Sequence, residues 1–182
     1  MGENKKAIKF LTKRKNDLMI VDDVRKNEML ARLYAANNQQ KKAVETLESL
    51  LRLNSSNSEY YHGILRAEGI VLQKGDIVKA DQREQFLEIM GKYVQVLPKS
   101  SHHTKIIVTH LEAGEDFKQR FYEHVKPQLI KGVPSMINDF RILYKQEGKA
   151  KIIGDLLLEL CDNMEKEMVL KLDDKEEQDP TV

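Results

Sequence analysis

The fold is decided by residues 24–57, which read VRKNEMLARLYAANNQQKKAVETLESLLRLNSSN. Apolar and small residues recur three and four positions apart in two runs, and such residues share one face of an α-helix. The recurring positions are Leu30, Ala31 and Tyr34 in the first run and Ala43, Leu47 and Leu50 in the second. The polar segment ANNQQ separates the two runs, and NSSN follows the second. The stretch therefore predicts two antiparallel helices joined by a tight turn.

The 34 residues match the length and pattern of a tetratricopeptide repeat. The small side chains of Ala31 and Ala43 would let the two helix backbones approach closely, while the leucines and Tyr34 would fill the groove between them. We therefore expect an all-α fold in which antiparallel helix pairs stack as a right-handed tetratricopeptide-like solenoid.

Residues 58–100 resemble a second, degenerate unit. Ser58 is the expected N-cap of its first helix, and its second helix is expected to end at Pro98. This unit is longer than the repeat pattern, and the surplus lies in an extended connection over residues 70–78. Upstream, residues 5–19 match only the second helix of a pair.

Looser helix pairs are expected over residues 101–170. Pro127 should kink or split a helix over residues 115–132, and residues 134–148 and 149–172 should form a final pair. The last helix carries a stripe too broad for burial on one side: Ile152, Ile153, Leu156, Leu157, Leu160 and Met164. We expect one domain over residues 1–170 and an acidic disordered tail over residues 171–182.

The composition is that of a soluble helical protein, with 41% hydrophobic and 32% charged residues. No apolar run reaches the roughly 18 residues of a membrane span, and the N-terminus has no apolar segment typical of a secretory signal. The single cysteine, Cys161, excludes an internal disulfide and suits the reducing cytoplasm. We expect Cys161 to be a buried packing residue.

The charge is unevenly distributed along the chain. Residues 1–20 contain six basic and two acidic side chains, whereas residues 162–182 contain eight acidic and three basic ones. Four basic residues near the start form a candidate contact for an anionic partner such as ribosomal RNA: Lys6, Lys9, Lys13 and Arg14. The alternative is an ordinary solvated helix face.

No pattern of catalytic or metal-binding chemistry is present in the sequence. It contains no strand-associated glycine-rich phosphate loop, no CxxC pair and no HExxH or GxSxG motif. The adjacent His102 and His103 would point about 100° apart on a helix and could not readily share a metal ion. His110 and His124 lie on polar stretches of different helices. We therefore expect no enzyme activity, no cofactor and no metal.

A second informative stretch is LIKGVPSMINDFRILYK, residues 129–145. Gly132 follows an apolar helical run, where a residue in the left-handed conformation commonly ends a helix. Pro134 then stands where it can occupy the first turn of the next helix. A phosphate-binding loop would need more glycines. The stretch is therefore interpreted as a joint between two helices.

The same stretch resembles a segment of the auxiliary, ribosome-anchoring subunit of the NatA-type protein N-terminal acetyltransferase. In that family a Lys-Gly-x-Pro element is followed by Asn and then by Arg/Lys-x-Leu-Tyr. The matching positions are Lys131, Gly132, Pro134, Asn138, Arg141, Leu143 and Tyr144. Collinear similarity extends over residues 5–170, including the 34-residue repeat and the helix after the Leu-Tyr-Lys element.

The resemblance implies a piece of a longer, ring-like tetratricopeptide solenoid. In the family, this solenoid wraps the catalytic acetyltransferase subunit and tethers it at the ribosome, and the catalytic residues belong to that partner. The resemblance therefore implies a non-catalytic scaffold. A general peptide-binding tetratricopeptide module is the alternative, in which Lys26 and Asn27 would clamp a carboxylate.

Overall fold

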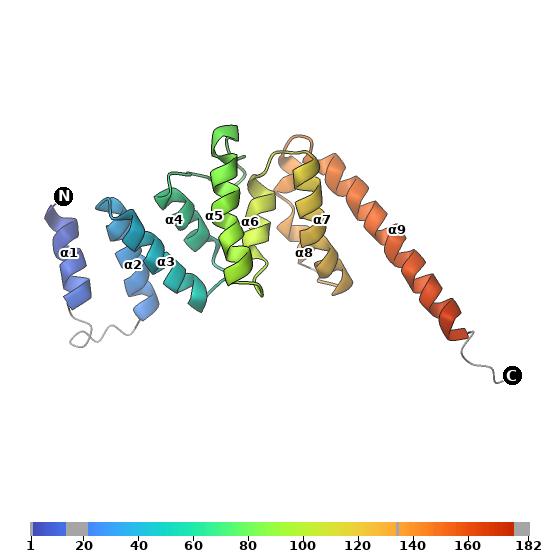
Figure 1. Cartoon of the computed structure of the whole chain (residues 1–182), viewed down its shortest axis with the longest axis horizontal. Helices are drawn as coiled ribbons and strands as arrows, with labels where there is room; N and C mark the ends of the chain where they lie inside the picture. Colours follow the sequence, from blue (N-terminus) through green and yellow to red (C-terminus); the bar gives the residue numbers. More distant parts are fainter. Residues whose placement is uncertain (1, 14–21, 134, 177–182) are drawn as a thin grey trace. The chain divides into compact units, whose positions relative to one another are not determined.

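The computed structural model describes residues 2–13, 22–133 and 135–176, and all regular elements in these ranges are helical. The expected all-α fold is therefore confirmed. Figure 1 labels the helices: α1 (Gly2–Lys13), α2 (Asp23–Ala36), α3 (Gln40–Leu53), α4 (Ser58–Ala67), η1 (Ala80–Gln82), α5 (Arg83–Val96), α6 (His102–His110), α7 (Glu115–Ile130), α8 (Met136–Asp139), η2 (Leu143–Lys145) and α9 (Lys149–Glu176).

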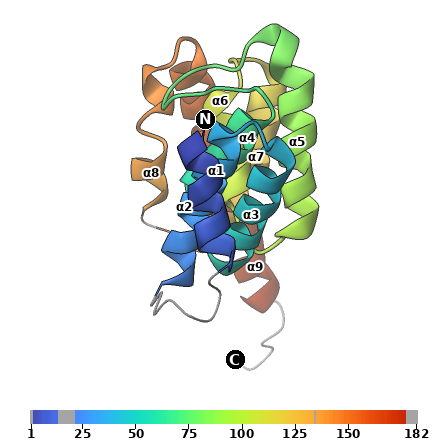
Figure 2. The same cartoon turned by 90° about the vertical axis from the view of Figure 1, so that its left-hand side faces the viewer.

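The chain divides into two compact units, Met1–Leu111 and Glu112–Val182. The single domain expected over residues 1–170 remains a prediction, since each unit is compact by itself. In the first unit, α1 packs against α2, α2 against α3, and α3 against α4 (Figure 1 and Figure 2). Only α1, rather than the whole of residues 5–19, is described as helix; residues 14–21 lie outside the described part.

The predicted antiparallel pair is α2 and α3. α2 begins at an N-cap, Asp22, whose side-chain oxygen accepts hydrogen bonds from the N–H groups of Val24 and Arg25. It ends at Ala36, and Asn38 two residues later adopts a left-handed φ of 58° that lets the N–H of Gln39 donate to the Tyr34 carbonyl at 2.9 Å. An Asn tolerates this conformation better than most residues, so the polar turn reverses the chain within three residues.

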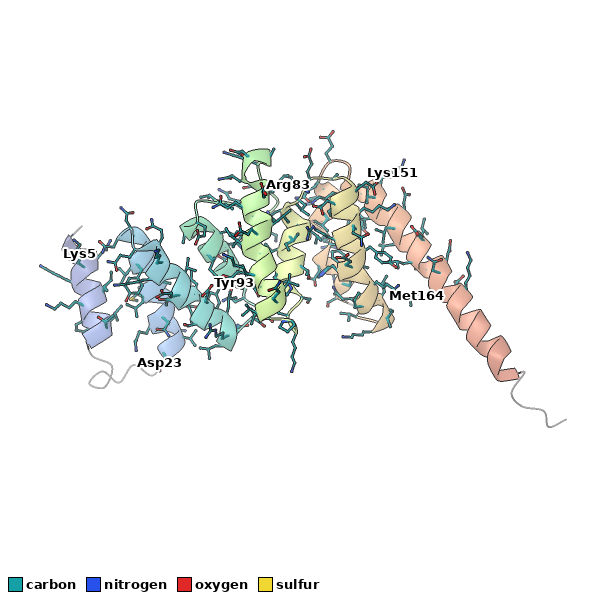
Figure 3. All side chains as sticks on the ribbon, in the orientation of Figure 1. Lys5, Asp23, Arg83, Tyr93, Lys151 and Met164 are labelled. Atoms are coloured by element: carbon teal, nitrogen blue, oxygen red, sulfur yellow. The ribbon has the colours of Figure 1, made fainter. Side chains whose placement is uncertain are left out.

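α4 begins one residue earlier than predicted from its cap. Asn57, not Ser58, is the N-cap, because its side-chain oxygen accepts from the N–H of Glu59 at 3.0 Å. The predicted apolar face of α4 is buried, and Tyr61 lies edge-on against Tyr93 of α5 with ring centroids 5.6 Å apart (Tyr93 is labelled in Figure 3). α4 is thereby joined to α5 through large side chains.

Residues 70–79 connect α4 to η1 without helix or strand, as the expected extended connection requires. Ile70 is fully buried, and the N–H of Val78 donates to the carbonyl of His110 at 2.8 Å. This connection is thus fixed against α6.

In the second unit, α7 continues as one helix through Pro127 to Ile130. Of the predicted kink or split, the split is therefore wrong, and the kink stays a prediction. Pro127 lies in the last turn of the helix, where it removes only one backbone hydrogen bond. The helix ends as predicted at Gly132, with φ of 63°. The N–H groups of Gly132 and Val133 donate to the carbonyls of Leu129 and Gln128, which is the Schellman pattern.

The helix expected over residues 134–148 is wrong. α8 spans only Met136–Asp139, and the three-residue η2 follows after a turn. Phe140 is buried 4.9 Å from Phe121, ring to ring, and Leu143 is buried three residues later. Successive bonds from Leu143 to Phe140 and from Gln146 to Leu143 follow the tighter 3₁₀ spacing, which suits a buried face repeating every three residues.

α9 buries only one side, against α7 and η2. Of the six residues of the predicted stripe, Ile153, Leu156 and Leu160 are buried, whereas the other three are only half-buried, so the stripe is not fully covered. Cys161 is exposed, which corrects its predicted burial: it lies about 100° around the helix from Leu160. α9 continues to Glu176, so the first residues of the predicted disordered tail are helical; residues 177–182 lie outside the described part.

Candidate functional site

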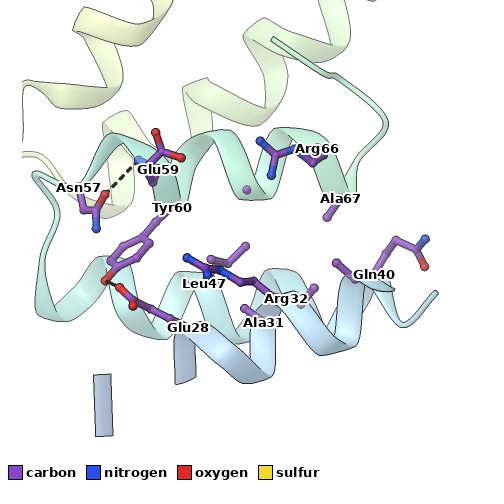
Figure 4. Close-up of a pocket in the computed structure, with 13 residues that line it drawn as sticks. Glu28, Ala31, Arg32, Gln40, Leu47, Asn57, Glu59, Tyr60, Arg66 and Ala67 are labelled. Carbon is purple, nitrogen blue, oxygen red and sulfur yellow. Dashed lines mark hydrogen bonds between the residues drawn. The ribbon is translucent and has the colours of Figure 1, made fainter. Parts of the chain in front are cut away.

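A groove of about 570 Å³ lies between α2, α3 and α4. Small side chains from all three helices line it, together with Leu47 (Figure 4): Ala31 and Ala35 from α2, Ala43 from α3, and Gly63 and Ala67 from α4. Small residues on facing helices leave room between the backbones. The groove is therefore a direct consequence of the alanines that define the repeat.

Gly63 sets how closely α4 approaches α3. A Cβ atom at this position would lie 3.0 Å from Cδ1 of Leu47, which is closer than ordinary van der Waals contact. Glycine therefore allows the α4 backbone to rest on the Leu47 side chain. This contact fixes the width of the groove at its centre.

Charged and polar groups surround the groove. Two exposed arginines, Arg32 from α2 and Arg66 from α4, line it along with Glu28 and Glu59 (Figure 4). Neither guanidinium forms an ion pair within the described part of the chain. Unpaired guanidinium groups can form bidentate hydrogen bonds with a carboxylate or phosphate. The groove thus offers two guanidinium groups beside two carboxylates.

Tyr60 connects the two walls of the groove. Its hydroxyl, on α4, donates to Oε1 of Glu28, on α2, at 2.7 Å. Burial, followed by this hydrogen bond to the carboxylate, raises the pKa of Tyr60. The tyrosine therefore remains protonated and the link persists at neutral pH.

The repeat positions lie inside the first unit as a packed layer. Leu30, Ala31, Ala43, Leu47 and Leu50 are buried, and Tyr34 is half-buried. The alternative clamp residues do not line the groove: Nζ of Lys26 is bonded to Asp23 at 3.1 Å, and Asn27 is absent from the groove lining within the described residues.

The structure describes three of the four basic residues that were predicted to contact an anionic partner. Lys6 and Lys9 are exposed on α1, and Lys13 is the last residue of that helix. Arg14 lies outside the described residues. Because Lys6 and Lys9 are exposed, a contact of α1 with an anionic partner stays a prediction.

The joint residues form no site of their own. Lys131 is the C-cap of α7 and Gly132 follows it, whereas Pro134 lies outside the described residues. Asn138 and Arg141 are exposed, Leu143 is buried and Tyr144 is 43% exposed.

The histidines differ from their predicted setting. His103, His110 and His124 are all buried, although the sequence placed His110 and His124 on polar stretches. Among the described residues, no group of three or more His, Cys, Asp or Glu side chains could hold a metal ion. No helix in that same part of the chain combines the length and hydropathy needed to cross a lipid bilayer.

Comparison with known proteins identifies the family. The model of the auxiliary subunit of N-terminal acetyltransferase A matches residues 1–182. The chain belongs to this family.

The chain is also similar to a curated protein and to a solved structure. The chain is 28% identical, over 159 residues, to the N-terminal acetyltransferase A complex auxiliary subunit NAA15 of Arabidopsis thaliana. The match covers 87% of this chain and 17% of that protein. The chain also superposes with a TM-score of 0.73 and 22% identity on a solved structure of Naa15/Naa10 bound to HypK-THB, covering 87% of this chain and 22% of the matched one. This family member thus spans less than a quarter of each relative.

Sequence reasoning did not identify Arg32, Tyr60, Gly63 or Arg66 as groove residues. Gly63 carries a recognisable signal, since a glycine inside a predicted helix commonly marks close packing. The arginines carry none, because only the packing of α2 against α3 and of α3 against α4 brings them to one groove.

Proposed function

We propose that this chain is a non-catalytic scaffold segment of a NatA-type auxiliary subunit. The observation that carries the proposal is the family match over residues 1–182. The groove between α2, α3 and α4 supports it, because small residues and exposed arginines suit contact with another polypeptide rather than a reaction.

The partner of the whole auxiliary protein is proposed to be the catalytic acetyltransferase subunit. The related solved structure contains Naa15 together with Naa10, which supports this choice of partner. The chain would contribute stacked helix pairs that fix the position of neighbouring segments, and the acetylation chemistry would remain with the partner. A cytoplasmic location, at the ribosome, follows from the same proposal.

The test uses the complete auxiliary protein that contains this segment, co-expressed with the catalytic subunit. Removing residues 5–170 should abolish co-purification of the two subunits, or lower acetylation of peptides that begin with Ser or Ala. If assembly and acetylation both remained at the level of the intact protein, the scaffold role would be lost.

Contact with the ribosome is proposed through the exposed lysines of α1. Replacing Lys6 and Lys9 with glutamine should weaken ribosome co-sedimentation and reduce its salt dependence, since each neutralised phosphate contact contributes to that dependence. A salt dependence unchanged by the two substitutions would argue against this contact.

A second candidate function is a peptide-binding module, favoured by the two exposed arginines along the groove. Short peptides rich in Asp and Glu should then bind, and Arg32→Gln should weaken binding by about tenfold because a charge-assisted hydrogen bond is lost. Lys92→Gln removes one charge on α5, outside this groove, and serves as the matched control. Equal effects of both substitutions would exclude specific docking in the groove.

A further inference from the structure

Two histidine rings from different helices face each other in the first unit. Nε2 of His62, on α4, lies 3.1 Å from Nε2 of His110, on α6. Their other nitrogens are also engaged: Nδ1 of His62 lies 2.8 Å from the Ser58 carbonyl oxygen, and Nδ1 of His110 lies 2.7 Å from the Asp76 carbonyl oxygen. All four ring nitrogens thus have a named neighbour.

If all of these contacts are hydrogen bonds, the pair carries one proton more than two neutral rings hold. A carbonyl oxygen only accepts, so each Nδ1 must carry a hydrogen. A neutral imidazole has a single N–H group, which would leave both Nε2 atoms as acceptors facing each other. A hydrogen bond between them forms only when one ring is protonated on both nitrogens. The His62–His110 pair therefore carries one positive charge when both of its carbonyl contacts and its ring contact are made.

The pair lines a pocket of about 510 Å³ that is rich in positive charge. Arg66 from α4, Lys74 from the connection and Lys105 from α6 line the same pocket. Glu59 is the single acidic side chain among its described lining residues. The Asp76 carboxylate accepts from the N–H of Gln73 at 2.8 Å and does not line the pocket. The basic side chains therefore outnumber the acidic one even before the proton of the pair is counted.

Neutral hydrogen-bonding groups complete the lining. The side chains of Ser56, Ser58, Gln73 and Thr109 reach the same pocket. Hydroxyl and amide groups alternating with guanidinium and ammonium groups suit a ligand that accepts many hydrogen bonds from several directions. A divalent cation would meet three basic side chains and a single acidic one, and within the described residues no third ligand joins the two rings.

We propose that this pocket binds a tetrahedral oxyanion of the phosphate class, and that the His62–His110 pair supplies part of the charge. The site does not depend on the proposed scaffold function, since its residues come from the turn before α4, from α4 and α6, and from the connection between α4 and η1, whatever partner the whole protein has. The oxyanion comes either from free phosphate or from a phosphorylated side chain of a partner protein.

The first test is titration of the 182-residue chain with inorganic phosphate at constant ionic strength, followed by isothermal calorimetry. Saturable binding is expected, and Lys74→Gln and Lys105→Gln should each weaken it by about tenfold because one charge-assisted hydrogen bond is lost. Lys92→Gln removes an exposed charge from α5, outside the pocket, and should change the affinity by less than about twofold. No binding, or equal weakening by all three substitutions, would overturn the site.

The second test examines the proton of the pair with sulfate, which stays a dianion over the range used. Loss of the additional proton removes one positive charge from the pocket, so sulfate affinity should fall several-fold as the pH is raised. The charged and titratable groups around the pair are Glu59 and Arg66 on α4, Lys74 and Asp76 in the connection, and His102 and Lys105 on α6. His62→Gln should flatten the profile, whereas His102→Gln should preserve most of it. A steep profile in His62→Gln would overturn the role of the pair.

A third measurement distinguishes the two sources of the oxyanion. A phosphoserine peptide that binds at least tenfold more tightly than inorganic phosphate, while its unphosphorylated form does not bind, assigns the pocket to a phosphorylated partner. Equal affinity for the peptide and for inorganic phosphate assigns it to the free ion. Equal binding of the phosphorylated and unphosphorylated peptides would overturn the proposal.

Discussion

Gly132 offers a direct test of the joint between α7 and α8. Its φ is 63°, and an added Cβ would meet no atom within 4 Å. The cost of Gly132→Ala therefore comes from the backbone conformation alone, and a left-handed alanine costs about 1–2 kcal/mol. Both backbone hydrogen bonds of the Schellman pattern would remain available, so no additional loss from an unpaired carbonyl is expected.

Gly154 supplies the matched control within the same unit. It lies inside α9, and an added Cβ would again meet no atom within 4 Å. Because alanine is the better helix former, Gly154→Ala should stabilise the chain by up to about 1 kcal/mol. The same chemical change thus has opposite signs at two positions, and the two variants should differ by about 1–3 kcal/mol.

Urea unfolding followed by circular dichroism measures both effects. With a slope of about 1–3 kcal/mol per molar urea, Gly132→Ala should lower the midpoint by roughly 0.3–2 M, and Gly154→Ala should raise it. Gly132→Asn should fall between the parent chain and Gly132→Ala, since asparagine tolerates the left-handed region. A neutral Gly132→Ala, or equal losses at both glycines, would refute the assignment of the joint.

Three further predictions concern buried groups. Burial lowers the pKa of the fully buried Lys149 from 10.5 to about 8. The free energy of unfolding of the parent chain should therefore rise by about 3 kcal/mol as the pH is raised between these two values. Urea titrations of Lys149→Met should not show that rise. Burial, then the neighbouring His102, lowers the pKa of His103, so unfolding free energy should fall as pH drops below 6.5, and thermal melts of His103→Leu should show a smaller fall. Gly63→Ala should destabilise by about 1 kcal/mol through its contact with Leu47, yet become neutral or stabilising in a Leu47→Ala background, as a double-mutant cycle would measure.

The helix pair α2–α3 was predictable because its signals are local. The spacing of Leu30, Ala31, Ala43 and Leu47 defines two apolar faces. The polar turn between them is short, which favours an antiparallel arrangement of the two helices. Gly132 was predictable for the same reason, since a helix end depends on a few neighbouring residues. Apolar periodicity and helix-ending residues therefore predict those elements whose determinants lie within one or two helical turns along the sequence.

The region after Gly132 shows where local signals fail. The apolar residues of 134–148 fit a helical stripe, but Phe140 packs against Phe121 and His124, with ring centroids 4.9 and 5.9 Å away. Satisfying these contacts together with burial of Leu143 requires the tighter turns that end α8 after four residues. Tertiary packing thus overrides a weak helix propensity.

The candidate phosphate pocket could not be predicted from local sequence signals. His62 and His110 are 48 positions apart, and each looks like an ordinary polar residue in its own helix. The connection over residues 70–78, which appeared to be surplus beside the repeat pattern, contacts one of the two. The Asp76 carbonyl accepts from His110, and the Val78 N–H donates to the His110 carbonyl, so the same ring and backbone are fixed by one short segment. An insertion relative to a repeat can therefore contribute to a site, because here its backbone contacts a buried ring of the pocket.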